Sequence, residues 1–240
     1  KEQGSRYIVK NAKFFNSQRA DFCPMFLDVN ADQLYWTSSN EKATGTEKSE
    51  ITGTKKCDIF VSKLNDKGKW QKPELVEGEL NTEFDEGCTA FSPDGGTMYL
   101  SKVVRRVESA SPVEIYSSSR SEAKWSAPQK VEITADTLSN YGDPAVSPDG
   151  KYLYFTSDMP GGQGKLDLWR INLKDRRGTL ENLGEQINTP GNERFPYCRT
   201  DSILYFASDG HAGFGGLDLF RATLQPSGRW FIENMGAPMN

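Results

Sequence analysis

The chain has 240 residues, 36% of them hydrophobic and 11% aromatic, which is enough for the core of one sizeable all-β domain. It carries 29 basic and 33 acidic residues, and this near-balance argues against a nucleic-acid groove. No apolar run reaches the length of about 18 residues that a membrane-spanning helix needs.

A Ser-Pro-Asp-Gly turn followed by a strand rich in tyrosine and phenylalanine recurs along the chain. It is clearest at 147–157 and 92–101, and diverged copies lie at 24–37 and 196–209. Proline presets the first turn position, aspartate bonds its own backbone and glycine takes the positive φ. One tyrosine marks each copy, and we call these four the register tyrosines: Tyr35, Tyr99, Tyr154 and Tyr205. Such a period, with short strands, predicts β-propeller blades.

Each copy predicts four antiparallel strands, called a to d in chain order. Strand a follows an asparagine-containing loop, and strand b carries the register tyrosine. We expect the strand b aromatics Trp36, Phe155 and Phe206 to face a neighbouring blade, as buried β aromatics do. The expected b strands are 34–37, 98–101, 153–156 and 204–207. The expected blades are 16–80, 81–138, 139–187 and 188–240.

Two further features concern the ends and the loops of the blades. Residues 7–10 (Tyr-Ile-Val-Lys) are typical of a strand d, but no strands a to c precede them. We therefore expect an orphan strand from an incomplete blade, with a parent of about five blades. Residues 41–56 and 105–111 are expected to be long insertions between strands b and c.

The repeat resembles a known family. Ser-Pro-Asp-Gly-Lys-Tyr-Leu-Tyr-Phe-Thr-Ser-Asp at 147–158, followed by Gly-Gly-Gln-Gly-Lys-Leu-Asp-Leu at 161–168, is similar to the PD40, or TolB-like, β-propeller repeat. The Asn-Thr loops and the Gly-Phe-Gly-Gly-Leu-Asp-Leu segment at 213–219 resemble propellers of Bacteroidetes OmpA-family cell-envelope proteins.

That resemblance implies a non-enzymatic scaffold in the periplasm, associated with the outer membrane. Its partners would be cell-envelope proteins, and peptidoglycan would be contacted only by another domain of the parent. One component of the type IX secretion system also combines such a propeller with a separate domain that contacts peptidoglycan. Two alternatives stay open: the propeller domain of a prolyl-oligopeptidase-like hydrolase, and a propeller that binds a small ligand or glycan.

No residue pattern predicts catalysis or a cofactor. The single histidine, His211, has no Gly-x-Ser-x-Gly nucleophile motif to serve. Asp158 and Asp167 are nine residues apart, as are Asp209 and Asp218, and each pair brackets a glycine-rich loop. Such carboxylates can hold Ca²⁺. We favour the alternative that they accept backbone N–H bonds and fix the loops, and we expect no metal.

The four cysteines show no metal-binding spacing. We expect four free, buried thiols at Cys23, Cys57, Cys88 and Cys198. Cys23 and Cys88 occupy equivalent positions of successive a strands near the axis. A bridge between them is the alternative if their Cα atoms lie within about 7 Å.

In propellers, the d–a and b–c loops share one face of the ring. These loops carry acidic residues, one histidine and one aromatic residue. We expect this acidic face to bind a protein partner or a basic ligand, since functional contacts gather on loops held by a rigid scaffold. The expected binding residues are Asp85, Glu86, Asp143, Glu193, Asp209, His211 and Phe214.

Overall fold

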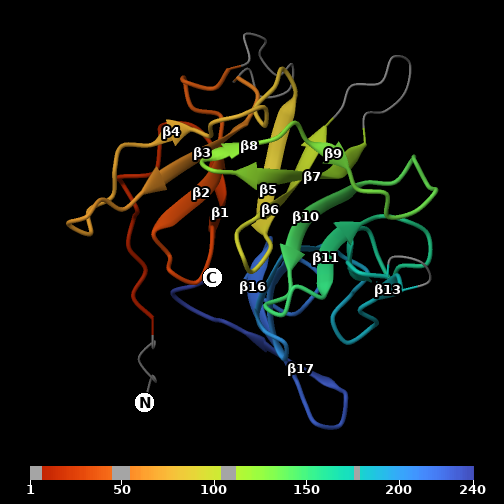
Figure 1. Cartoon of the computed structure of the whole chain (residues 1–240). Helices are drawn as coiled ribbons and strands as arrows, with labels where there is room; N and C mark the ends of the chain where they lie inside the picture. Colours follow the sequence, from red (N-terminus) through yellow and green to blue (C-terminus); the bar gives the residue numbers. More distant parts are fainter. Residues whose placement is uncertain (1–6, 45–54, 104–111, 176–178) are drawn as a thin grey trace.

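The computed structural model describes residues 7–44, 55–103, 112–175 and 179–240. The described part contains seventeen strands and no helix, and hence no helix that could cross a membrane. Its strands form four antiparallel sheets around a common axis (Figure 1). The predicted all-β propeller of four-stranded blades is therefore confirmed.

Each blade is a meander that starts at the axis and ends at the rim. Blade 1 contains β1 (Asp21–Phe26), β2 (Gln33–Ser38), β3 (Asp58–Lys63) and β4 (Glu74–Leu75). Blade 2 contains β5 (Asp85–Phe91), β6 (Thr97–Val103), β7 (Val113–Ser121), β8 (Lys124–Trp125) and β9 (Gln129–Lys130), so two short strands share its outer edge. Blade 3 contains β10 (Tyr141–Val146), β11 (Tyr152–Ser157), β12 (Asp167–Asn172) and β13 (Glu181–Asn182). Blade 4 contains β14 (Glu193–Thr200), β15 (Ile203–Ser208), β16 (Asp218–Leu224) and β17 (Trp230–Asn234).

The Ser-Pro-Asp-Gly turns between the first two strands of blades 2 and 3 form as their sequence predicts. In blade 3, the Gly150 amide donates to the Ser147 carbonyl at 2.8 Å, and Gly150 has a φ of 67°. The Ser147 hydroxyl and the Lys151 amide both donate to Asp149. The strand that follows this turn, β11, lies in the core, where Leu153 and Phe155 are fully buried.

The strand b aromatics follow the prediction in blades 3 and 4 but not in blade 1. Phe155 shares a core cluster with Ile115 of blade 2, and Phe206 shares one with Leu168 of blade 3. Trp36 instead stacks on Phe60 of its own blade and contacts Phe15 of the N-terminal segment. The expectation for Trp36 was wrong because this side of blade 1 has no preceding blade against it.

The innermost strands pack in order around the axis. β1 contacts β5, β5 contacts β10, and β10 contacts β14, whereas no comparable contact joins β14 to β1 within the described ranges. Residues 7–10 are exposed and are assigned to no strand among the described residues, so their membership of an incomplete blade stays a prediction. The expected insertions fall largely on residues 45–54 and 104–111, which lie outside the described residues.

Candidate functional site: the axial cavity

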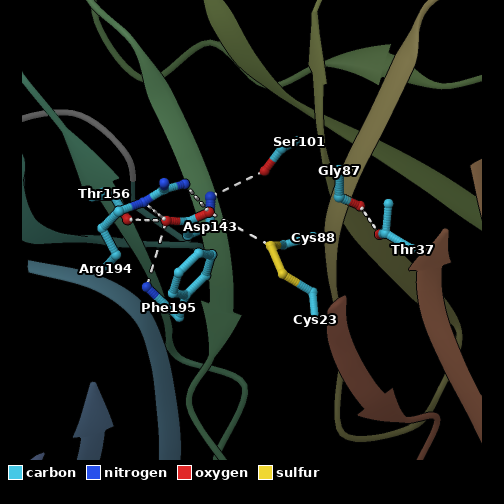
Figure 2. The surroundings of a disulfide bond; sticks show 9 residues. All are labelled: Cys23, Thr37, Gly87, Cys88, Ser101, Asp143, Thr156, Arg194 and Phe195. Atoms are coloured by element: carbon cyan, nitrogen blue, oxygen red, sulfur yellow. Dashed lines mark hydrogen bonds and ion pairs between the residues drawn. A yellow bond between two sulfur atoms is a disulfide. The ribbon is translucent and has the colours of Figure 1, made fainter. Parts of the chain in front are cut away.

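Four equivalent residues of the innermost strands surround the axis: Cys23, Cys88, Asp143 and Phe195 (Figure 2). Each follows or lies within a register shift between the first two strands of its blade. Cys23, Asp143 and Phe195 have positive φ values of 51°, 47° and 53°. Bulges of this kind turn one side chain out of the sheet's regular alternation, here toward the axis. We call these four residues the axial positions.

Cys23 and Cys88 form a disulfide between β1 and β5, with their Cα atoms 5.1 Å apart. The expectation of four free thiols was therefore wrong, and the alternative bridge is correct. The repeat places Cys23 and Cys88 at equivalent positions, and the bulges turn both side chains toward the axis, where they meet. Cys57 and Cys198 are free, and burial raises the pKa of the Cys57 thiol to about 11 and that of Cys198 to about 12.

Asp143 links blade 3 to blade 4. Its carboxylate accepts hydrogen bonds from Arg194 Nε at 2.9 Å and Arg194 Nη2 at 3.1 Å, and a third from the Thr156 hydroxyl at 3.0 Å. Cys88 Sγ lies 3.5 Å from the same carboxylate, and the Arg194 guanidinium stacks on the Phe195 ring. A continuous set of contacts therefore joins all four blades at the axis, as Figure 2 shows.

A cavity of about 630 Å³ opens on one side of these axial contacts. A second, more apolar cavity of about 460 Å³ lies on the other side, and Phe22, Cys88, Asp143 and Phe195 line both. Charged side chains border the larger cavity together with apolar ones. The charged set is Asp85, Glu86, Lys102, Asp143, Asp158, Lys165 and Arg194, and the apolar set is Phe22, Val103, Val113, Leu166 and Phe195.

Two of the predicted binding residues are internal supports instead of surface groups. Glu86 accepts hydrogen bonds from the amide and hydroxyl of Thr82, and Glu193 does the same with Thr189. Both glutamates are fully buried. A hydroxyl residue four positions before the carboxylate is the sequence signal for this loop, and Ser17 with Asp21 repeats it. Asp143 is also buried and paired, so the predicted acidic face is not exposed at these three residues.

Glu86 has the most unusual environment of the carboxylates bordering the larger cavity. Burial raises its pKa to about 7, although the hydrogen bonds from Thr82 and the charge of Lys102 act in the opposite direction. Lys102 Nζ lies 3.3 Å from Glu86 Oε1. The carboxyl group therefore titrates near neutral pH within the wall of the cavity.

The remaining predicted residues do not join this cavity, except for Asp85. Asp85 borders it and accepts a hydrogen bond from the Cys57 amide at 2.9 Å. Asp209 accepts two bonds from Asn192, and His211 Nε2 lies 2.8 Å from the Ile187 carbonyl oxygen, with its ring packed on Phe206. Phe214 is 72% exposed on the b–c loop of blade 4.

The glycine-rich loops are held by their aspartates, as favoured from the sequence. Asp167 accepts bonds from the amides of Gln163 and Gly164, and Asp218 accepts one from Phe214. Asp158 and Asp209 accept the amides of Asn140 and Asn192 instead, and so fix the loop that precedes strand a. Within the described residues, no cluster of three His, Cys, Asp or Glu side chains is arranged to hold a metal ion.

Sequence reasoning missed Arg194 and Lys165 at the cavity. Arg194 precedes an axial position, and the equivalent residues in the other blades are Phe22, Gly87 and Gly142. No repeated signature marks this position, so only the fold shows that the guanidinium lies beside Asp143. Lys165 lies in a loop that the glycine pattern marked only as a wide turn.

Comparison with solved structures agrees with this architecture. TolB from Acinetobacter baumannii superposes with a TM-score of 0.58 and 19% identity, over 91% of this chain and 44% of that chain. The likeness shows a TolB-like β-propeller fold. A puromycin-hydrolyzing peptidase from Mycobacterium tuberculosis superposes with a TM-score of 0.51 and 15% identity, over 97% of this chain and 31% of that chain.

This chain therefore spans less than half the length of these two proteins. No family model and no curated protein matches the sequence. At these sequence identities, the similarity to solved propellers gives information about the fold and not about activity.

Proposed function

We propose that this TolB-like propeller is a non-enzymatic protein-interaction scaffold whose larger axial cavity receives a segment of a protein partner. The cavity of about 630 Å³ is the observation that carries the proposal. Its walls combine apolar side chains, which supply contact area, with charged ones, which fix orientation, as binding pockets generally do. Phe22, Leu166 and Phe195 are the apolar part, and Lys165 and Arg194 are the cationic part.

The axial contacts support this proposal because they make the cavity rigid. The Cys23–Cys88 disulfide and the Asp143–Arg194 ion pair join neighbouring blades directly beneath it. A preformed site loses little conformational freedom on binding, so more of the contact energy appears as affinity.

The disulfide also supports a location outside the cytoplasm. Disulfides persist in oxidising compartments such as the bacterial periplasm and are rare in the cytosol. We place the protein in the periplasm, associated with the outer membrane, in accordance with its resemblance to Bacteroidetes OmpA-family propellers. Participation in type IX secretion is the most specific form of this proposal, and peptidoglycan would be contacted only by another domain.

The environment of the single histidine bears on the alternative of a hydrolase propeller. The single histidine of the chain, His211, has its Nε2 engaged with the Ile187 carbonyl oxygen and its ring packed between Phe206 and Phe220. It is a structural anchor of blade 4, so the hydrolase alternative would need its catalytic residues on a separate domain.

The test is capture of envelope proteins by the folded chain, with charge reversal at the cavity. Lys165→Glu reverses an exposed charge at its border, and Lys174→Glu makes the same change in the c–d turn of blade 3. We expect Lys165→Glu to weaken capture of a specific protein several-fold and Lys174→Glu to leave it unchanged. Equal capture by both variants would contradict the proposal.

A further inference from the structure

Two fully buried carboxyl groups meet where blade 1 joins blade 2. Asp58 begins β3 and Glu86 lies in β5, and both residues are 0% exposed. The Glu86 amide donates to the Cys57 carbonyl at 2.9 Å, which brings the two acidic residues together, and their side chains are in hydrogen-bond contact. Cys57 and Glu86 also line the larger cavity. Two ionised carboxylates in such contact repel each other strongly where water is excluded.

The Asp58 carboxylate has donors on only one of its two oxygens. Oδ2 accepts hydrogen bonds from the amide and the hydroxyl of Thr44. Oδ1 is buried and has no donor in the part of the chain that the structure describes. Buried polar atoms are nearly always paired, so this oxygen indicates a donor that a fully ionised pair would lack.

Blade 3 shows what blade 1 lacks. Asp167 occupies the position of Asp58 there, at the start of the third strand and opposite a serine. It accepts hydrogen bonds on both carboxylate oxygens, including one at 2.9 Å from Asn182 of the last strand. In blade 1 the equivalent of Asn182 is Leu75, whose side chain cannot donate. Asp58 is therefore short of a donor that its repeat equivalent has.

The Glu86 carboxyl group can supply the missing donor. Its Oε1 accepts the Thr82 hydroxyl at 2.6 Å and lies 3.3 Å from Lys102 Nζ. Its Oε2 accepts the Thr82 amide at the longer distance of 3.2 Å. A proton on Oε2 preserves both contacts of Oε1 and gives Asp58 Oδ1 a donor. One proton also removes one of the two buried charges, which are costly where water is excluded.

The charges around the pair agree with one bound proton. The neighbouring titratable and charged groups are Lys102 of β6, Lys55 in the loop before β3, Asp85 of β5, the Cys57 thiol, and Glu114 of β7 with its partner Lys130. Burial raises the pKa of the thiol to about 11, so it is neutral, and Glu114 is balanced by Lys130. Among the other groups, two cations stand against three carboxyl groups, and one proton balances them.

We propose that Asp58 and Glu86 share one proton and that this proton is a pH-sensitive latch between blades 1 and 2. While it is present, a hydrogen bond from Glu86 to Asp58 closes the interface at the border of the larger cavity. When it is lost, two carboxylates remain in contact and the interface loosens there. Burial raises the pKa of both groups, that of Glu86 to about 7, so the latch opens above neutral pH. This inference goes beyond the proposed function, since it holds whatever the cavity binds.

The test follows both carboxyl carbons by carbon-13 NMR in the full chain, from about pH 4 to about pH 9. In a shared pair, the Asp58 and Glu86 signals change together, with one midpoint near pH 7. Asp58→Asn should lower the Glu86 midpoint by about 1 pH unit or more, since it replaces a negative neighbour with an amide that can donate. Asp85→Asn is the matched control: Asp85 is partly exposed and bonds the Cys57 amide, so the midpoint should move much less.

Amide exchange tests the latch itself, because the Glu86 amide bonds Cys57 across the interface. Its protection, corrected for the intrinsic pH dependence of exchange, should fall several-fold above about pH 7. In Glu86→Gln it should stay constant, since the neutral amide donates to Asp58 at every pH.

Three results would overturn the proposal. If Asp58→Asn leaves the Glu86 midpoint unchanged, burial alone explains the titration and no proton is shared. An Asp58 carbon that titrates independently of Glu86 in the unchanged protein has the same meaning and needs no variant. Equal protection of the Glu86 amide on both sides of the midpoint would show that the proton does not hold the interface.

Discussion

The carboxylate of Asp143 and the guanidinium of Arg194 form a bidentate ion pair at the axis, between blades 3 and 4. Asp143 is almost completely buried, and Arg194 is the one charged group among its hydrogen-bond partners in the described part of the chain. Cys88 Sγ lies beside the same carboxylate, so the pair also connects to the disulfide of blades 1 and 2. The centre of the propeller is therefore held by polar and covalent contacts.

Removing the arginine should destabilise the fold more than removing a surface arginine. In Arg194→Ala, the Asp143 carboxylate stays buried without its partner, at a cost of about 1–3 kcal/mol after allowance for the partial exposure of Arg194. Arg221→Ala is the matched control, because its pair with Glu233 is exposed on both sides and should matter by less than about 1 kcal/mol. Urea unfolding measures both, and equal costs would contradict the argument.

The Cys23–Cys88 disulfide should be detectable by thiol titration and should stabilise the fold. Thiol titration of the denatured, unreduced protein should find two thiols, Cys57 and Cys198. Cys23 and Cys88 are 65 residues apart, so the chain-entropy model gives a stabilisation of about 4 kcal/mol. Cys23→Ser and Cys88→Ser should each lower the urea midpoint, whereas Cys57→Ser should lower it much less. A count of four thiols would exclude the bridge.

The fold could be read from the sequence because its determinants are local and repeated. The turn chemistry around Ser147 and Gly150, and a buried aromatic such as Phe155 in the next strand, specify the same unit in each copy. Local turn preference and hydrophobic pattern agree there, and that agreement makes a prediction secure.

The site could not be read in the same way because it depends on where the blades meet. The bulges that turn Cys23, Cys88 and Asp143 to the axis involve one extra residue in a strand, which leaves no fixed sequence signature. Glu86 and Glu193 were misassigned to the surface since an acidic loop residue is usually exposed. Thr82 and Thr189, four residues earlier, are the signal that they fold back onto their own loops.

The asparagine before strand a should act as a clamp between successive blades. Asn188 is buried, accepts the Leu168 amide at 2.8 Å and donates to the Leu168 carbonyl at 3.0 Å. Asn188→Ala leaves both backbone groups unpaired and should cost about 2–3 kcal/mol. Asn16→Ala is the control, since Asn16 is exposed and its side-chain amide donates to the exposed Asn11, and it should shift stability by less than about 0.5 kcal/mol. Similar urea midpoints for the two variants would refute the clamp.

Glu86 should make the stability of the propeller depend on pH near neutrality. Burial raises its pKa to about 7 in the folded protein from the ordinary value of 4.5, so between these pH values the folded state holds a proton that the unfolded state has lost. Stability should therefore fall as pH rises from about 4.5 to about 7, by on the order of 3 kcal/mol from this group. Below about pH 4.5, Glu86 is protonated in both the folded and the unfolded state and does not destabilise the fold. Above about pH 7, it is ionised in both states, and its destabilising effect no longer changes with pH.

Two substitutions separate this contribution from those of other groups. Glu86→Gln cannot ionise, so the slope of unfolding free energy against pH should become flatter between pH 5 and 7, as urea unfolding at several pH values would measure. Thr82→Val acts in the opposite direction, since the Thr82 hydroxyl donates to Glu86 Oε1 at 2.6 Å and favours the ionised carboxylate. Loss of this hydrogen bond should raise the Glu86 pKa further, so that the free energy of unfolding continues to fall above pH 7. An unchanged slope in Glu86→Gln would show that Glu86 keeps the same protonation state in the folded and unfolded chain.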